Sequence, residues 1–422
     1  MTRYLARGAT LGAALTMLLT GGAGRACETR IGVVMELTGP AAAYGQAGAK
    51  SVEMAFRDIN AAGAAAGCSL VADTRDSQSQ GTLAVDAAKQ LVEVQHVPAL
   101  IGGIISSTTI PILTAVTAPA KVVQVSPAAT SPTLTELGKQ GKTNGIFFRT
   151  ITSDALQGVA AAQYALDLGI KKLAIIHVNN DFGVNLTREF SRAYTALGGT
   201  ITSTTPYNER QSSYDAEVTA AMAADPQALY LISYPADGAT IARAWISQGG
   251  VRKFLLNDGM NSGDFIDAVG ARYLPDAYGT SSGTETSPST KYFDANYKAF
   301  SNLDPGSPAA PQAYDAAALV GLAIAVAGRA DSEAIRAGIY KATDPNGTPV
   351  YAGADGFKAA LTLLKAGKPI RYVGVIGPIA FDKYGDITGP FREWQIVGGK
   401  VVTRGTLSTA QVNAIQAKIG AR

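Results

Sequence analysis

Residues 98–111 read PALIGGIISSTTIP, and this stretch indicates the fold class of the chain. The run 99–101 is apolar without alternation, which is typical of a strand buried on both faces of a parallel sheet. Two glycines then permit a tight turn. The hydroxyl residues that follow predict a helix with Ser106 or Ser107 as its N-cap. The free N–H groups of such a helix start suit a carboxylate or a phosphate, although an ordinary capped helix has the same signature.

The same strand, loop and helix pattern repeats on both sides of this stretch. Strands are expected at 30–37, 69–74, 99–101 and 121–125, with helices at 50–61, 82–94 and 110–117. A second series starts near Phe148, with helices at 154–168, 185–196, 214–223 and 239–248 and strands at 172–178, 200–206, 228–232, 253–257 and 277–282. Strict alternation of this kind predicts a parallel, doubly wound α/β sheet with right-handed crossovers in each series.

The alternation stops after residue 282. Helices are expected at 291–300, 313–327, 332–341 and 357–364, strands at 372–382 and 393–402, and a terminal helix at 408–419. Because 422 residues exceed the size of one hydrophobic core, the chain is expected to form two domains.

The first 26 residues have the pattern of a secretory signal peptide. Arg3 and Arg7 precede the apolar run 11–19, and small residues lead to a cleavage site near Ala26. This segment holds three arginines and no acid, which accounts for the whole net charge of +3, so the mature chain is neutral. We therefore expect a periplasmic protein with no electrostatic reason to bind nucleic acid.

The two cysteines, Cys27 and Cys68, open the first and second predicted strands. Neighbouring parallel strands start side by side, so we expect a disulfide, which an oxidising compartment allows. Lipidation of Cys27 is the alternative, but Arg25 and Ala26 before it make a poor lipidation signal.

Ligands of doubly wound sheets bind beyond the carboxyl ends of the strands. Six residues in loops at such ends stand out, and they carry aromatic rings, hydroxyls and one carboxylate but no cation: Tyr44, Ser106, Thr130, Phe182, Tyr234 and Asp258. This set favours a pocket for a small zwitterion or a neutral molecule over a catalytic centre.

Two motifs resemble catalytic sites, but each lacks a residue that its chemistry requires. The run 279–283 fits G-x-S-x-G, but both histidines, His96 and His177, precede it in the chain, whereas that triad needs a histidine after the serine. The run 138–143 resembles a phosphate loop, but Glu136 occupies the position of its first glycine. Two separated histidines and two cysteines provide no metal cluster. We expect neither an enzyme nor a cofactor.

A set of short motifs, in order and spacing, resembles the periplasmic solute-binding proteins of ABC transporters, of the leucine/isoleucine/valine-binding type. The resemblance covers nearly all of the mature chain. The matching motifs are Gly39-Pro40, Tyr44-Gly45, Ile101-Gly102, 106–109, 126–132, Asp154 with Gln157-Gly158, 181–183, 257–259, 313–315, Gly377-Pro378 and Phe381-Asp382.

The resemblance implies the type I periplasmic binding protein fold, in which two lobes joined by three crossings close over a ligand in the cleft between them. The N-terminal lobe would comprise 27–147 and 284–388, and the C-terminal lobe 148–283 and 389–405, followed by a C-terminal helix at 406–422. We expect a monomer.

The resemblance also implies roles for the residues at matching positions. Ser106 and Thr130 would hold a ligand carboxylate, with Ser107 beside them, while the Ala128 carbonyl and Asp258 would accept from its ammonium. Tyr44 would line the N-terminal lobe, and Phe182 and Tyr234 would close from the other lobe.

Three departures from the leucine-binding type bear on the ligand. Asp258 replaces a glutamate, Phe182 replaces a tyrosine, and the region 345–371 is longer. A buried Asp258 without a cationic partner would be costly, so we expect an ammonium ligand or a raised pKa.

The implied function is capture of a small amino acid or related carboxylate by hinge closure, for delivery to a membrane permease. Two alternatives stay open. One is a receptor for aromatic or aliphatic carboxylates that lack an ammonium group, and the other is a sensory protein that presents its ligand to a membrane receptor.

Overall fold

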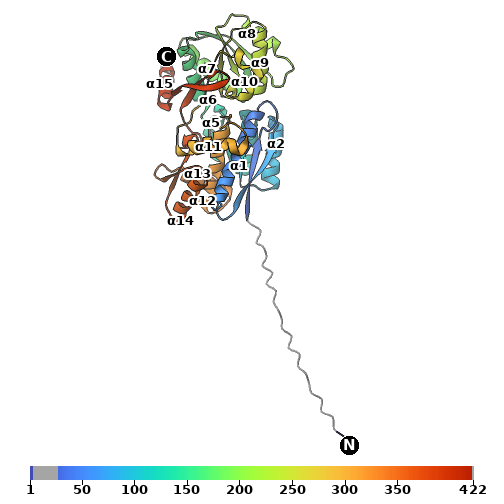
Figure 1. Cartoon of the computed structure of the whole chain (residues 1–422), viewed down its shortest axis with the longest axis vertical. Coiled ribbons are helices and arrows are strands. Elements are labelled where there is room, and N and C mark those ends of the chain that lie inside the picture. The colour runs from blue at the N-terminus through green and yellow to red at the C-terminus, as the bar shows by residue number, and fades with distance from the viewer. Residues whose placement is uncertain (3–26, 421–422) are drawn as a thin grey trace.

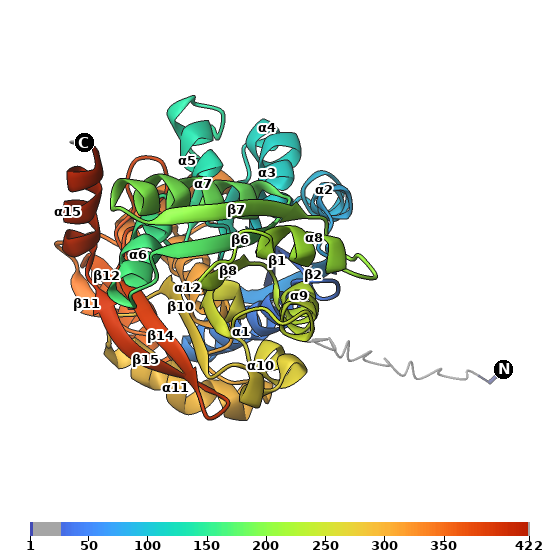
Figure 2. The same cartoon turned by 90° about the horizontal axis from the view of Figure 1, so that it is seen from above.

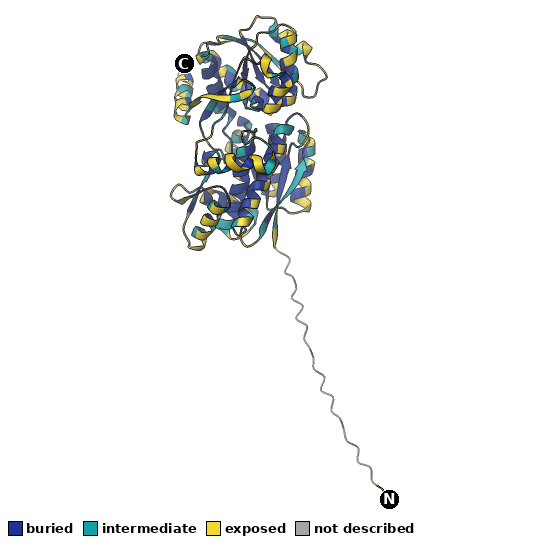
Figure 3. Cartoon of the chain, in the orientation of Figure 1, coloured by how far each residue is buried: buried dark blue, intermediate teal, exposed yellow. Residues whose placement is uncertain are grey.

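A computed structural model describes residues 1–2 and 27–420, which form two α/β lobes stacked one above the other (Figure 1). Apart from its first two residues, the predicted signal peptide lies outside the described residues. In both lobes the central strands are buried, the edge strands are partly exposed, and the outward faces of the surrounding helices are exposed (Figure 3).

The N-terminal lobe is built on a five-stranded sheet of order β2-β1-β3-β4-β5, in which all neighbouring strands are parallel. Its strands are β1 (Glu28–Met35), β2 (Ser69–Asp76), β3 (Ala99–Gly102), β4 (Val123–Ser126) and β5 (Phe147–Arg149). The helices between them are α1 (Ala42–Ala62), α2 (Gly81–Lys89) continued by η1 (Gln90–Val94), α3 (Ser106–Ile112) continued by η2 (Leu113–Thr117) and α4 (Ala118–Ala120), and α5 (Pro132–Lys139).

A later part of the chain returns to this lobe. It contributes α11 (Pro288–Ser301), α12 (Ala310–Ala327), α13 (Ser332–Ala342) and α14 (Ala354–Lys365), with a small sheet of β11 (Thr348–Val350), β12 (Ile370–Gly374) and β13 (Gly377–Pro378). Among the described residues, α12 alone is long and apolar enough to suit a membrane span by length and composition. Most of it is buried against α1 and α13, so it serves as the central core helix of the lobe.

The C-terminal lobe is built on a seven-stranded sheet of order β15-β14-β10-β9-β8-β6-β7. Its strands are β6 (Lys172–Val178), β7 (Thr200–Tyr207), β8 (Ala228–Ile232), β9 (Lys253–Leu256), β10 (Asp276–Ser282), β14 (Phe391–Val397) and β15 (Lys400–Leu407). Its helices are α6 (Asp154–Asp167), α7 (Asp181–Ala196), α8 (Asp215–Met222), α9 (Pro235–Ser247), η3 (Asp258–Met260), α10 (Gly263–Val269), η4 (Ala271–Tyr273) and α15 (Thr409–Gly420). Seen from above, β14 and β15 form one side of this lobe, with α15 beside them (Figure 2).

The chain crosses between the lobes three times, after β5, after β10 and after β13. The predicted architecture of two parallel-sheet lobes joined by three crossings is therefore confirmed. Two strand predictions near the C-terminus were wrong in detail. The range 372–382 is strand only to Gly374 and again at Gly377–Pro378, and 393–402 is the middle of an antiparallel hairpin, β14 and β15, that turns at Gly398-Gly399.

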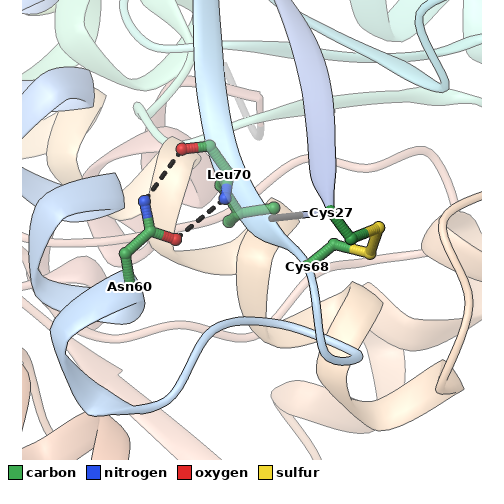
Figure 4. Close-up of a disulfide and its surroundings, with 4 residues drawn as sticks. All are labelled: Cys27, Asn60, Cys68 and Leu70. Carbon is green, nitrogen blue, oxygen red and sulfur yellow. Dashed lines mark hydrogen bonds between the residues drawn. A yellow bond between two sulfur atoms is a disulfide. The ribbon is translucent and has the colours of Figure 1, made fainter. Parts of the chain in front are cut away.

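A disulfide joins Cys27 to Cys68, with their Cα atoms 4.6 Å apart. It lies where β1 and β2 begin side by side, as the strand order predicted (Figure 4). Next to it, the Asn60 amide donates to the Leu70 carbonyl and accepts from the Leu70 N–H, which fixes the end of α1 against β2.

Candidate ligand-binding site

Seven of the eight side chains predicted to contact ligand lie around one cavity between the lobes, which we call the clamp: Tyr44, Ser106, Ala128, Thr130, Phe182, Tyr234 and Asp258, together with Ile105. Ser107 is outside this lining, and its buried hydroxyl has no hydrogen-bond partner among the described residues. The clamp encloses only about 10 Å³, so its side chains nearly fill the space between the lobes.

Ser106 is the first residue of α3 rather than its N-cap, because the cap position is taken by Ile105 with no side-chain capping bond. The prediction of a serine cap was therefore wrong. The Ser106 side chain is 1% exposed, and its Oγ accepts from the Ser131 N–H at 3.1 Å. The hydroxyl proton of Ser106 is not used in that bond, so it can be donated to a ligand.

Thr130 is held differently. Its hydroxyl donates to Asp154 Oδ2 at 2.8 Å, and its carbonyl accepts from the Asp154 N–H at 2.9 Å. While that bond is made, the Thr130 oxygen can only accept from a ligand, and its backbone N–H is the group left to meet a carboxylate.

The three aromatic residues stand at helix starts, whereas the sequence pattern placed them in loops. Tyr44 lies in the first turn of α1, which begins eight residues earlier than predicted, and Phe182 is the second residue of α7, behind the N-cap Asn180. Tyr234 is the N-cap of α9. Turn-forming residues such as Gly39 and Asn180 suggested loops, but they lie immediately before the helices.

These rings bring the lobes into contact. Tyr44, from the N-terminal lobe, meets Tyr234 edge to face with ring centres 6.5 Å apart, and Tyr234 stacks on Phe182 at 5.7 Å. The Asn180 amide donates to the Tyr234 hydroxyl at 3.2 Å. The aromatic cluster therefore joins the N-terminal lobe to two helix starts of the C-terminal lobe.

Two acidic side chains dominate the electrostatics. Burial raises the pKa of Asp258, against hydrogen bonds from Asn257 and Gln157 that lower it. Burial and the nearby Asp258 raise the pKa of Asp154 well above its usual range, against the Thr130 hydrogen bond and the charge of Arg149, which lower it. Asp154 Oδ1 has no hydrogen-bond partner among the residues that the structure describes. Among the described residues neither acid makes a salt bridge, so the clamp favours a cation.

Asp154 and Gln157 do not line the clamp but bond to Thr130 and Asp258, which do, although sequence reasoning assigned them only to a motif. Their one signal was the position of the motif at the start of α6, directly after the first crossing. That signal does not show that the two side chains turn toward Thr130 and Asp258.

A larger cavity of about 210 Å³ adjoins the clamp on the side of the crossings, and we call it the side cavity. Tyr44, Ala128 and Asp258 line both spaces. Further along, it runs between the loop before α12 and the strands β10 and β14.

The catalytic look-alikes have no suitable geometry. Ser281, the serine of the G-x-S-x-G match, lies within β10, whereas a nucleophile elbow requires a sharp turn from strand to helix. Among the residues that the structure describes, no group of three His, Cys, Asp or Glu side chains could hold a metal ion.

The periplasmic binding protein family model matches residues 28–373, so the chain belongs to this extracytoplasmic family, which consists of solute-binding proteins rather than enzymes. The Leu/Ile/Val-binding protein BraC3 of Rhizobium johnstonii is 28% identical over 377 residues, which are 89% of this chain and 93% of that protein.

Solved structures of similar fold include two proteins of 24% identity, each of which covers 90% of this chain and 99% of its own. One is the leucine-binding protein LivK of Thermotoga maritima, with a TM-score of 0.77. The other is LivJ of Streptococcus pneumoniae in complex with isoleucine, with a TM-score of 0.74.

Proposed function

We propose that this protein captures an α-amino acid in the clamp and delivers it to the permease of an ABC transporter. The observation that carries the proposal is the pair Asp154 and Asp258. Two neighbouring acids with raised pKa values and no salt bridge among the described residues are costly, and a ligand ammonium would offset that cost. The relatives are named for binding leucine, isoleucine and valine or leucine alone, and these names support the same class of ligand.

The opposite side of the clamp suits a carboxylate. The Ser106 hydroxyl can donate, and the N–H groups of Ser106 and Ser107 precede the first hydrogen bonds of α3, which Thr108 and Thr109 make to the Ile105 carbonyl. Thr130 would add its backbone N–H, while Tyr44, Phe182 and Tyr234 would cover the apolar part of the ligand.

Delivery to a permease requires that the ligand change the shape of the protein surface. In the proposed mechanism the lobes hinge at the three crossings, and the ligand selects the closed form because only there do both lobes contact it. Two contacts between the lobes would form on closure. One is the ring contact of Tyr44 with Tyr234, and the other is the hydrogen bond from the Asn185 amide to Ser131 Oγ at 3.1 Å. We propose that the protein acts as a periplasmic monomer.

A thermal-shift screen of residues 27–422 tests the proposal. Each L-amino acid would be paired with the matching acid that lacks the amine, and aromatic acids would be included. A ligand at one hundred times its Kd should stabilise the protein by about 2.7 kcal/mol. The proposal expects shifts only from amino acids.

The variant Asp258→Asn tests the ammonium role directly. It should weaken amino-acid binding about 10- to 100-fold, because a charge-assisted bond becomes neutral. The matched control is Asp267→Asn, an exposed acid on α10. If only acids without an amine bind, the role of Asp258 is wrong and the alternative receptor for such carboxylates is supported. A sensory role would be supported if the protein binds the ligand but its removal from the cell leaves uptake of that ligand through the permease unchanged.

A further inference from the structure

The side cavity has polar walls that an aliphatic ligand would leave unpaired. Arg392 on β14, Ser281 on β10 and Gln312 on α12 all line it. The Arg392 Nε, the Ser281 hydroxyl and the Gln312 amide oxygen are buried without a hydrogen-bond partner in the described part of the chain. Ser281 is 6% exposed and Gln312 is 9% exposed, so solvent does not satisfy them fully. Buried polar groups without partners are rare because each is costly.

Arg392 is the most informative of the three. Its guanidinium makes no salt bridge and no side-chain hydrogen bond to any described residue, and burial lowers its pKa. Arg392 lies directly opposite Ser281 in the antiparallel pair of β14 and β10, so both side chains are on the same face of the sheet. A guanidinium beside a hydroxyl donor forms a site that suits a carboxylate.

The acids around the side cavity do not neutralise Arg392. Asp258 stands at the inner end, which it shares with the clamp, and Asp294 on α11 is exposed to solvent at the rim. Neither lies within salt-bridge distance of the guanidinium. An anion at Arg392 and an ammonium at Asp258 would therefore occupy two ends of one continuous space.

We propose that Arg392, with Ser281, forms an anion subsite for the side chain of the ligand, so that the protein takes an α-amino acid whose side chain ends in a carboxylate. This inference rests on the proposed amino-acid clamp and narrows its ligand class. It distinguishes this chain from relatives named for leucine, isoleucine and valine, whose side chains offer nothing to a guanidinium.

Isothermal titration of the mature protein with L-glutamate, L-aspartate, L-glutamine, L-leucine and glutarate tests the proposal. At least one acidic amino acid should bind about 10-fold or more tighter than glutamine and leucine. In the variant Arg392→Gln that acidic ligand should lose about 10- to 100-fold in affinity, while glutamine is unaffected. Arg392→Lys, which keeps the charge but not the planar fork, should lose less.

The control variant is Arg404→Gln, an exposed arginine on the neighbouring strand β15 that does not line the side cavity. It should leave every affinity unchanged. Melting temperatures without ligand should agree among the variants, which separates lost binding from lost folding. The ranking of ligands by the unmodified protein is a test that requires no variant.

The proposal is overturned if the unmodified protein prefers leucine or glutamine, if no acidic amino acid binds, or if Arg392→Gln weakens acidic and neutral ligands equally. Failure of the proposed amino-acid clamp would give a different titration result. If glutarate binds as tightly as glutamate and is lost in Arg392→Gln, the anion subsite stands while the ammonium role of Asp258 falls.

Discussion

Ser106 and Ser107 differ in their contact with the clamp although they are neighbours in the sequence. The two serines are adjacent and chemically identical, yet only Ser106 lines the clamp, with its oxygen fixed by the Ser131 N–H. The sequence pattern identified the hydroxyl-rich turn and left the helix cap open between the two serines, whereas the family resemblance assigned the carboxylate to Ser106 with Ser107 beside it.

The change Ser106→Ala tests this choice. It removes a clamp hydroxyl whose proton is available to a ligand carboxylate, so affinity should fall about 10-fold or more. Calorimetric titration with the best ligand of the screen would measure the loss. Thr114→Ala, an exposed hydroxyl on η2, should have no effect. Equal affinities of the Ser106 variant and the unmodified protein would place the carboxylate elsewhere.

Asp154 and Arg392 show the limit of sequence reasoning at this scale. Both are ordinary charged residues in the sequence, more than two hundred positions apart. Their interest comes from what surrounds them after folding, namely a second acid beside Asp154 and a polar cavity without a counter-ion beside Arg392. No spacing or composition signal records such an environment.

At the scale of elements, the parallel strands were predicted well because each is a short apolar run followed by turn residues. β6 and β8 match their predicted ranges residue for residue. Helix starts were predicted less well, and α1 and α7 both begin earlier than their apolar spacing suggests. The first turns are stabilised by tertiary contact rather than by their own pattern, and these turns carry Tyr44 and Phe182.

Gly45 determines how closely α1 approaches the end of β1. A Cβ at this position would lie 2.0 Å from the Glu36 carbonyl oxygen, so Gly45→Ala must push the helix away from the strand. We expect a loss of about 1–3 kcal/mol in the free energy of unfolding. Ligand binding should weaken too, because Tyr44 moves with the helix.

Urea unfolding and ligand titration would measure both effects of Gly45→Ala. The control is Gly263→Ala in the first turn of α10, where no atom lies within 4 Å of the added carbon. It should leave binding unchanged and should leave stability the same or raise it by up to about 1 kcal/mol. A Gly45→Ala protein as stable as the unmodified one would show that α1 can shift at no cost.

The disulfide fixes the opposite end of the same elements. It closes a loop of 41 residues, so replacing both cysteines by serine should lower the free energy of unfolding by about 4 kcal/mol on the loop-entropy model. Because the bridge lies at the start of β1 and the clamp beyond its end, ligand affinity should be unchanged. Unfolding curves and titrations of the double variant would show whether these two properties separate.

At the scale of the whole molecule, the described part of the chain keeps several acids buried without a salt bridge. Burial raises the pKa of Glu36 to about 7 and that of Asp315 to about 7, and the pKa values of Asp154 and Asp258 are also raised. Glu36 and Asp315 lie in the N-terminal lobe away from the clamp lining, where they accept hydrogen bonds from backbone N–H groups and hydroxyls. The fold therefore carries a cost in burying charge that grows as these acids ionise.

This cost predicts how stability depends on pH. Each of these acids has a higher pKa in the folded protein than in the unfolded chain, so the folded state holds protons that the unfolded chain has released. The contribution of these acids to the free energy of unfolding of the ligand-free protein should therefore be fully present below about pH 4 and fall as the pH rises to about 7. For Glu36 alone the difference amounts to about 3 kcal/mol.

The variant Glu36→Gln removes the contribution of Glu36 to the pH dependence of the free energy of unfolding. An amide can accept from the Ile104 N–H and donate to the Thr108 hydroxyl, which then donates to the Ile105 carbonyl, so no partner is lost. The variant should be more stable than the unmodified protein at pH 8 and should lose less stability between pH 5 and pH 8. Urea unfolding at unit pH steps would measure both slopes. Parallel slopes for the two proteins would mean that Glu36 is ionised in the folded state throughout this range and that its burial does not raise its pKa.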